Sequence, residues 1–224
     1  MTILCIETST SVCSAAVCKD GSLIKQCINY EGSNHARLLP MYIEELLSFA
    51  REQHLSIDAV ALSEGPGSYT GLRIGASTAK GLCYGLNVPL IPVPTLEVLC
   101  EAARKQSAVS SQYSDVLLPM IDARRMEVYT MMDGETKAVV VENEDSLYAG
   151  DEDVYYFGDG AAKCQPVLSK PNWHYIPDIV PEAQYVGALA ESGKWKVESV
   201  DLAYYEPFYL KEFIAAQSHV KGLK

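Results

Sequence analysis

The glycine-rich segment at residues 65–75, which reads GPGSYTGLRIG, is the part of the sequence best suited to binding a ligand. It follows a strand-like run and opens a helix-compatible stretch, a context in which backbone N–H groups bind phosphate. It is not a Walker A loop, because no Gly-Lys-Ser/Thr follows and Lys80 lies too far into the helix. Its glycine spacing also departs from a dinucleotide fingerprint, and the next strand ends in PVP instead of an acid. The segment therefore supplies only part of what a nucleotide site needs.

Titratable side chains offer isolated candidates for catalysis or metal binding. Glu7 and Asp122 each end a strand-like run, and the sequence DARR that begins at Asp122 fits either a site or, as we favour, an Asp–Arg pair that fixes a turn. No histidine has a second histidine or carboxylate at ligand spacing, and Leu39 stands where an HxxxH pair starting at His35 would need its second histidine. We therefore expect no metal site. Ser68 lacks a GxSxG elbow and an identifiable base.

Small residues recur every four positions, at Gly71, Gly75 and Ala79, in the helix that follows the glycine-rich segment. Each glycine costs a helix about 1 kcal/mol relative to alanine, so several of them need a compensating reason. Close approach of another element is that reason, either inside the chain or at a protein interface. The wide apolar stripe of a helix expected at 35–53 favours the interface. On that interpretation, Gly75→Leu would abolish pairing and leave the monomer folded.

The elements that position these residues alternate along the first half of the chain. Asp20-Gly21 predicts a tight hairpin, since such turns favour positive φ at both central positions. Ser33 or Asn34 can cap a helix, and Pro40 should bend that helix or shift its start. The expected strands are 2–8, 12–19, 22–30, 58–64 and 88–93, and the expected helices are 35–53, 69–86 and 95–105.

The second half repeats the pattern of the first. Residues 116–122 and 126–132 match the first two strands, and Asp133-Gly134 repeats the Asp20-Gly21 turn. This repeated pattern predicts a duplicated domain, with an N-terminal lobe at 1–105 and a C-terminal lobe at 106–224. The remaining expectations are a linker at 106–114, strands at 136–142 and 153–157, helices at 160–168 and 181–192, and a helix-compatible stretch at 203–216 docked on the core.

Composition restricts the class of protein. The chain has 224 residues, 48% of them hydrophobic, and a net charge of −11 from 18 basic and 29 acidic residues. This charge opposes unaided binding of nucleic acid. The excess is concentrated at 133–159, which we interpret as a solvated face. Seven cysteines without a CxxC pair are expected to be free core thiols. With no signal peptide or membrane span expected, we predict a soluble cytoplasmic protein.

Several segments together resemble the TsaB (YeaZ) family. They are ILCIETSTSVCSAAV near the N-terminus, the helix start at 35–39, GPGSYTGLRIGASTAKGL at 65–82, IDARRMEVY at 121–129 and FYLK at 208–211. The resemblance spans nearly the whole chain. It implies an α/β, two-lobed fold of the actin/Hsp70/sugar-kinase type with duplicated RNase H-like lobes.

The resemblance also implies a function. Members are non-catalytic partners of the paralogous subunit TsaD, and with the ATPase TsaE they act in threonylcarbamoyl transfer to N6 of adenosine 37 in tRNAs that read codons starting with A. No cofactor is then expected in this chain, whereas ATP and a divalent metal are expected in its partners. The tRNA would be contacted only through the complex, and the chain would form a homodimer when its partner is absent.

Family members pair through the two helices of the first lobe, which implies a set of interface residues. Arg73 would either bond across that interface or cap a local carbonyl. A vestigial nucleotide site is implied at Glu7, Asp122, Gly158 and Gly160. It is weakened by two departures from the family, in which position 7 is commonly Asp and position 126, here Met, is usually Gly. The implied interface residues are His35, Leu39, Tyr42, Leu46, Tyr69, Leu72, Arg73, Gly75 and Ala76.

Two other functions compete with the scaffold subunit. One is an ATP-using enzyme of the kinase/ATPase class, with Glu7 and Asp122 placing Mg²⁺ and 158–160 near the nucleotide; a glycoprotease-like hydrolase is disfavoured. The other is direct tRNA binding, which the charge opposes although Lys211, Lys221 and Lys224 lie near the C-terminus.

Overall fold

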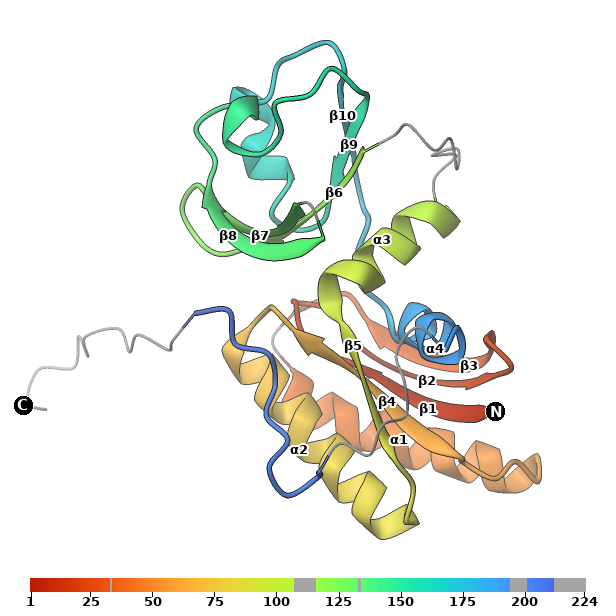
Figure 1. Ribbon diagram of the computed structural model, residues 1–224. Coiled ribbons are helices and arrows are strands. Elements are labelled where there is room, and N and C mark those ends of the chain that lie inside the picture. Colours follow the sequence, from red (N-terminus) through yellow and green to blue (C-terminus); the bar gives the residue numbers. More distant parts are fainter. Residues whose placement is uncertain (33, 107–115, 133, 194–200, 212–224) are drawn as a thin grey trace, which may run out of the picture.

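The computed structural model of this chain describes residues 1–32, 34–106, 116–132, 134–193 and 201–211. These residues form two lobes, each built on a five-stranded sheet, with helix α3 (Thr95–Gln106) between them (Figure 1). The two-lobed α/β architecture expected from the sequence is confirmed. Among the helices in these ranges, none is both long and apolar enough to span a membrane.

The first sheet has the strand order β3-β2-β1-β4-β5. Strands β1, β2 and β3 form an antiparallel meander, whereas β1, β4 and β5 run parallel. Strand β1 is buried along its whole length because both faces of the sheet are covered, which explains its continuous apolar run. The strands are β1 (Thr2–Glu7), β2 (Cys13–Lys19), β3 (Ser22–Asn29), β4 (Ala59–Gly65) and β5 (Leu90–Pro94).

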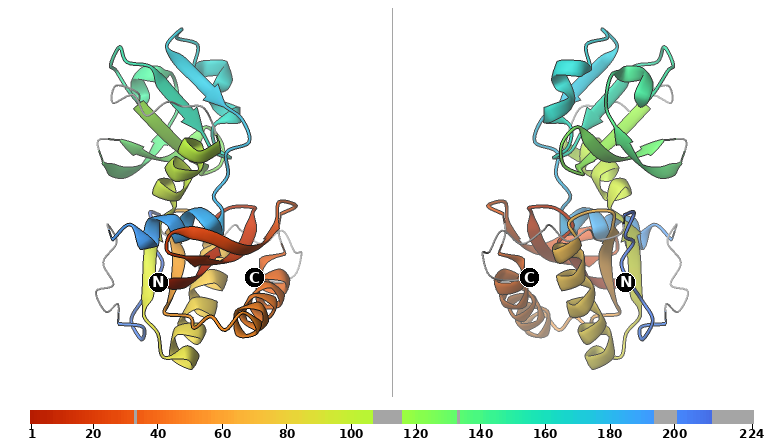
Figure 2. Two further views of the ribbon diagram at one scale, coloured as in Figure 1. Left: turned by 90° about the vertical axis from the view of Figure 1, so that its right-hand side faces the viewer. Right: turned by 90° about the vertical axis from the view of Figure 1, so that its left-hand side faces the viewer.

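Two helix pairs cover the faces of this sheet. Helices α1 (His35–Glu52) and α2 (Tyr69–Leu86) pack on one face, where Leu39 and Leu46 meet Leu4. Helices α3 and α4 (Ala183–Glu191) cover the opposite face (Figure 2). The core under α3 and α4 continues into the second lobe through Ile121 and Phe157. This cluster therefore joins the two lobes, while the second lobe also has a separate core of its own.

The second sheet repeats the order of the first, with β8-β7-β6-β9-β10 in place of β3-β2-β1-β4-β5. The meander of β6, β7 and β8 is antiparallel, and β6, β9 and β10 are parallel. The duplication predicted from the sequence is confirmed. The strands are β6 (Val116–Asp122), β7 (Glu127–Met132), β8 (Glu135–Val140), β9 (Val154–Phe157) and β10 (Trp173–Ile176), and the 3₁₀ helices are η1 (Glu144–Ser146) and η2 (Ala162–Val167).

The hairpin turn of the first meander has the predicted backbone. Asp20 and Gly21 have φ of 51° and 74°, the left-handed values that a tight hairpin requires at both central positions. In the second meander, Gly134 has φ of 77°, and Asp133 lies outside the described residues. The helix caps differ from the prediction, because the side chain of Asn34 makes no capping bond and Ser33 is also outside the described residues. Helix α1 begins at His35, so Pro40 does not shift its start.

Three element predictions in the second half need correction. The helix expected at 160–168 is the shorter 3₁₀ helix η2, which contains Pro166. Strand β10 was not predicted, since its four residues carry little periodic signal. The stretch 203–211 is not helical, and the rest of that prediction, 212–216, lies outside the described residues. Of the linker expected at 106–114, Gln106 is the last residue of α3, and 107–114 lie outside the described residues.

The predicted boundary also differs from the structure, because part of 106–224 packs on the first lobe. Helix α4 lies against the first sheet. Residues 201–211 run along α2, where Lys80 Nζ donates to the carbonyl oxygens of Ala203 and Tyr205 at 3.2 and 3.1 Å. The N–H of Phe208 donates to the Glu64 carbonyl at 2.8 Å. The chain therefore returns to the first lobe after completing the second.

Candidate partner-binding site

A groove of about 480 Å³ lies between α1 and α2 on the outer surface of the first lobe. Most of its walls are short side chains, with Tyr69, Ile74 and the exposed Arg73 as the larger ones, so the two helices leave a shallow channel that a partner helix can enter. No other segment of the described chain fills it. The lining residues are Ala36 and Pro40 from α1, and Tyr69, Thr70, Arg73, Ile74, Ser77 and Thr78 from α2.

One end of this groove carries a cluster of two aromatic rings and a cation. The Arg73 guanidinium lies 5.3 Å from the centre of the Tyr69 ring and donates to the Tyr69 hydroxyl at 3.0 Å. The Tyr209 ring, from the C-terminal segment, lies 5.0 Å from the Tyr69 ring. Arginine and tyrosine are enriched among residues that dominate binding energies. We expected Arg73 either to bond across an interface or to cap a local carbonyl. Its local contacts are instead with the hydroxyl and the ring of Tyr69.

The small-residue face of α2 packs inside the lobe. A Cβ on Gly71 would overlap the Thr8 carbonyl oxygen, and one on Gly75 would overlap the Thr8 hydroxyl and lie 3.0 Å from Leu62 Cδ1. The Thr8 hydroxyl donates to the Gly71 carbonyl at 2.9 Å. The expectation that Gly75→Leu would spare the monomer is therefore wrong, because this helix face already holds the loop between β1 and β2. Leu72 and Ala76 are buried with it.

The predicted α1 residues also face inward. Leu39 and Leu46 are fully buried in the core, and Tyr42 packs half-buried against it. His35 is buried, and its Nε2 lies 3.0 Å from the Thr10 carbonyl oxygen, to which it donates in the matching tautomer. Within the set predicted for the interface, the groove brings together Tyr69 and Arg73.

The groove residues that sequence reasoning missed are the exposed neighbours of the predicted ones. Apolar side chains guided the prediction, and they mark the face of each helix that packs on its own sheet. The informative signal is the set of short polar residues on the opposite face of α2, at Thr70, Ser77 and Thr78.

Glu7, the first acid of the predicted vestigial nucleotide site, is fully buried. Its Oε1 accepts the Ser9 N–H at 2.6 Å, whereas its Oε2 has no hydrogen-bond partner among the described residues. Burial raises the pKa of Glu7, because charging it in this site is costly. The Glu7 carboxyl therefore lies in the interior of the first lobe.

The second-lobe residues of that site are engaged with one another. Asp122 Oδ1 accepts the Arg124 N–H at 3.0 Å and the Lys163 ammonium. A Cβ on Gly158 would overlap the Met120 carbonyl oxygen, and one on Gly160 would lie 2.8 Å from the Ile121 carbonyl carbon. These glycines allow a loop to pack on β6. Asp122 therefore fixes the turn, as we favoured. It does so by accepting the backbone N–H of Arg124 instead of pairing with an arginine side chain.

Metal ligands and charged surfaces add no further site. No group of three or more histidine, cysteine, aspartate or glutamate side chains able to hold a metal occurs within the described ranges. Six of the seven cysteines are buried and all are free. The described acids of 133–159 are exposed apart from Glu144, in agreement with a solvated face. Lys211 pairs with Glu127 of the second lobe, and Lys221 and Lys224 lie outside the described residues.

Comparison with known proteins places the chain in a family. The family model described as "TsaD: tRNA N6-adenosine threonylcarbamoyltransferase" matches residues 29–158. The tRNA threonylcarbamoyladenosine biosynthesis protein TsaB of Haemophilus influenzae is 37% identical over 131 residues, which are 58% of this chain and 52% of that protein. The Escherichia coli TsaB is 36% identical over 129 residues, 58% of this chain and 53% of its own length. The chain thus spans about half the length of the curated relatives it matches.

Solved structures give a likeness over the full length. YeaZ from Pseudomonas aeruginosa superposes with a TM-score of 0.71 at 27% identity, covering 93% of this chain and 99% of that one. A second Pseudomonas aeruginosa structure, described as similar to peptidase YEAZ, gives a TM-score of 0.73 at 25% identity, with 94% and 99% coverage.

Proposed function

The chain belongs to the TsaB (YeaZ) family, within the wider family described as TsaD, and on this premise we propose that it is a non-catalytic subunit of a tRNA-modifying complex. Its partner is a TsaD-like paralogue. The complex transfers a threonylcarbamoyl group to N6 of adenosine 37 in tRNAs that read codons starting with A. The observation that carries the proposal is the open groove between α1 and α2.

The groove has the properties of a surface for a partner helix. Short side chains at Ala36, Ser77 and Thr78 let a second backbone approach closely. Tyr69 and Arg73 supply an anchor of the residue types that dominate interfaces. The core beneath the groove is tightly packed, because Gly71 and Gly75 let α2 lie directly against the loop after β1. A rigid helix pair loses little entropy on binding.

The arrangement of the acids supports a subunit without its own ATP chemistry. Glu7 is buried against Ser9, and Asp122 already holds the Lys163 ammonium. A kinase-type site would need such carboxylates free to bind Mg²⁺ with the phosphates. The ATP-using alternative is therefore not favoured.

Other partners follow from the same proposal. In the absence of the paralogue, the groove pairs with that of a second copy, in a two-fold interface that uses the same patch of both subunits. A TsaE-like ATPase joins the complex, and tRNA is bound through the complex because this chain carries a charge of −11. ATP and the divalent metal belong to the partners, and the complex acts in the cytoplasm.

The test is association with the TsaD-like paralogue of the same genome, measured by light scattering during size-exclusion chromatography. We expect a heterodimer with the natural chain. Ser77→Arg places a long charged side chain in the groove and should weaken pairing by at least about tenfold, or about 1.4 kcal/mol. Because Ser77 is exposed, the fold should remain intact by circular dichroism.

The matched control is Glu52→Arg, which adds the same side chain at the exposed last residue of α1, away from the groove. It should pair as the natural chain does. Normal pairing by Ser77→Arg would refute the groove assignment, and no association of the natural chain with the paralogue would refute the subunit role.

A further inference from the structure

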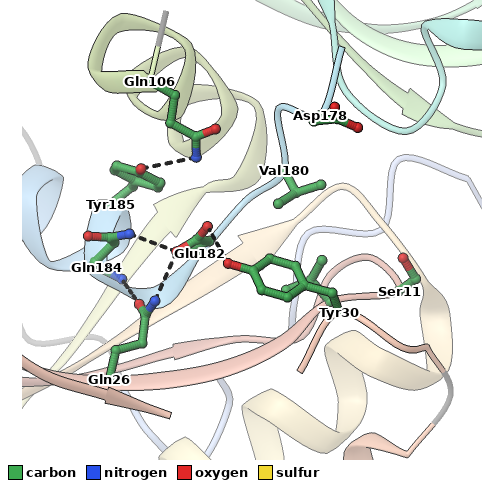
Figure 3. Close-up of a pocket in the computed structure, with 10 residues that line it drawn as sticks. Ser11, Gln26, Tyr30, Gln106, Asp178, Val180, Glu182, Gln184 and Tyr185 are labelled. Atoms are coloured by element: carbon green, nitrogen blue, oxygen red, sulfur yellow. Dashed lines mark hydrogen bonds between the residues drawn. The ribbon is translucent and has the colours of Figure 1, made fainter. Parts of the chain in front are cut away.

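A second concave site lies at the edge of the first sheet, beside the segment that returns from the second lobe (Figure 3). Its volume is about 680 Å³. Four separate parts of the chain build it: the start of β2, the end of β3, the end of α3 and the residues that lead into α4. They contribute Ser11, Val12, Gln26, Tyr30, Gln106, Asp178, Val180, Glu182, Gln184 and Tyr185.

The Glu182 carboxylate is the centre of this site and is only 5% exposed. Its Oε2 accepts the side-chain amides of Gln26 and Gln184 at 2.8 and 2.7 Å, and its Oε1 accepts the Tyr30 hydroxyl at 3.1 Å (Figure 3). A carboxylate has about four acceptor positions. Three donors therefore hold the group in place and leave one position, on Oε1, for a further donor.

Among the described residues, no cationic side chain balances the negative charge of the site. No lysine, arginine or histidine lines it, and the described residues give Glu182 only neutral donors. Asp178 adds a second carboxylate to the wall. A buried carboxylate without a cationic partner is costly, and a bound cation would lower that cost.

The helix terminus beside the site is not available to an anion. The first amides of α4 are already engaged, since the N–H of Ala183 donates to Ser14 Oγ and the N–H of Gln184 donates to Gln26 Oε1, both at 2.9 Å. The site therefore lacks the free N–H groups by which a helix N-terminus binds phosphate or carboxylate.

Two tyrosine rings complete the walls. Tyr185 is buried, and its hydroxyl accepts the Gln106 amide at 3.1 Å, which fixes the ring. Tyr30 is 57% exposed and lies beside Glu182 (Figure 3). Burial and the neighbouring Glu182 charge raise the pKa of Tyr30, so its phenol remains a donor to that carboxylate. Aromatic faces beside carboxylates favour organic cations.

We propose that this site binds a small organic cation, a primary ammonium or guanidinium group carried on an apolar body. The cation donates to the open position on Glu182 Oε1, and the apolar body lies between Tyr30 and Val180. The site is separate from the groove between α1 and α2. If the cation proposal is refuted, the proposed subunit role is therefore unaffected.

The test uses three probes of one shape and different charge: benzylamine, benzyl alcohol and benzoate. Each is titrated into the ¹⁵N-labelled full chain while the side-chain amide signals of Gln26 and Gln184 are followed by NMR. For a probe of about eight non-hydrogen atoms, about 0.5 kcal/mol per atom gives a dissociation constant near 1 mM. We expect benzylamine to bind in that range, benzyl alcohol at least about tenfold more weakly, and benzoate not at all.

Variants that replace a carboxylate by the neutral amide test where the cation binds. Glu182→Gln should weaken benzylamine binding by about tenfold or more, because hydrogen bonds to charged groups are the strong ones. Asp178→Asn, at an exposed residue, should weaken it by about threefold without affecting the fold. Glu52→Gln removes an exposed carboxylate far from the site and should change nothing. Equal binding of benzoate and benzylamine, shifts confined to other residues, or no shift at about 10 mM amine would each overturn the proposal.

Discussion

The two lobes share a strand order but differ in what covers their sheets. In the first lobe, α1 and α2 lie on one face and α3 and α4 on the other, so β1 and six of the seven residues of β2 are buried. In the second lobe, the 3₁₀ helices η1 and η2 take the places of α1 and α2 in the chain order, and β7, the counterpart of β2, has only two buried residues of six. The duplicated strands thus set the architecture, whereas the added helices of one copy provide the proposed partner surface.

Both lobes bring a glycine against the end of their first strand. In the first lobe Gly71 lies against the Thr8 carbonyl, and in the second Gly158, with φ of 104°, lies against the Met120 carbonyl. Neither position has room for a Cβ. If the close approach is equally important in both copies, alanine should cost at least as much at Gly158 as at Gly71, because the positive φ of Gly158 adds backbone strain.

We expect Gly71→Ala and Gly158→Ala each to lower the free energy of unfolding by about 3 kcal/mol, because backbone atoms must move to admit the methyl group. Urea unfolding followed by circular dichroism measures this. The control is Gly81→Ala, in α2, where an added Cβ would meet nothing within 4 Å; it should stabilise by about 0.5–1 kcal/mol. A loss below about 1 kcal/mol at Gly158 would show that the second lobe tolerates looser packing than the first.

A buried glutamate in each lobe gives a second contrast. Glu7 in the first lobe accepts one backbone N–H and leaves Oε2 unpartnered among the described residues. Glu144 in the second accepts the backbone N–H groups of Ser169 and Lys170, at 2.5 and 2.7 Å. Burial raises the pKa of Glu7. For Glu144, burial also acts to raise the pKa, but the hydrogen bonds to its backbone partners together lower it.

The two shifts predict opposite dependences of stability on pH. Glu144, with a lowered pKa, stabilises above its unfolded value of about 4.3, and this contribution is lost as the pH falls through its folded pKa. Glu7, with a raised pKa, costs stability as the pH rises above about 4.3. At pH 7 we expect Glu144→Gln to destabilise by about 2 kcal/mol and Glu7→Gln to stabilise by about 1 kcal/mol. Urea unfolding of each variant at pH values from about 4 to about 7 measures both differences, and equal signs would contradict this account.

Nine of the ten strands in the described residues could be predicted from the sequence because they depend on local signals. Alternating or continuous apolar runs mark the strands, and Asp20-Gly21 marks the turn that sets the register of the first meander. The repeated pattern at 116–132 predicts a second meander, which β6, β7 and β8 form. Helix α2 is predictable from its position after the glycine-rich loop.

The placement of individual helix faces could not be predicted, because it depends on contacts between distant segments. Nothing in the sequence around Gly71 and Gly75 indicates that Thr8 lies on them, and the same spacing suits a protein interface. Likewise, α4 follows the second lobe in sequence but packs on the first sheet. The proposed cation site joins residues as far apart as Ser11 and Glu182, which no local pattern connects.

The last comparison concerns the hairpin turn between the second and third strands of each lobe. Gly21 and Gly134 have φ of 74° and 77°, and a Cβ added at either would meet no atom nearer than 3.7 Å, so the cost of alanine at each comes from the backbone alone. That cost is about 1 kcal/mol. Because Ile121 and Phe157 of the second lobe belong to the core of the first, we expect one cooperative transition and equal losses for Gly21→Ala and Gly134→Ala in urea unfolding. If Gly134→Ala instead shifted a separate transition and left the other in place, the lobes would unfold independently in spite of their shared core.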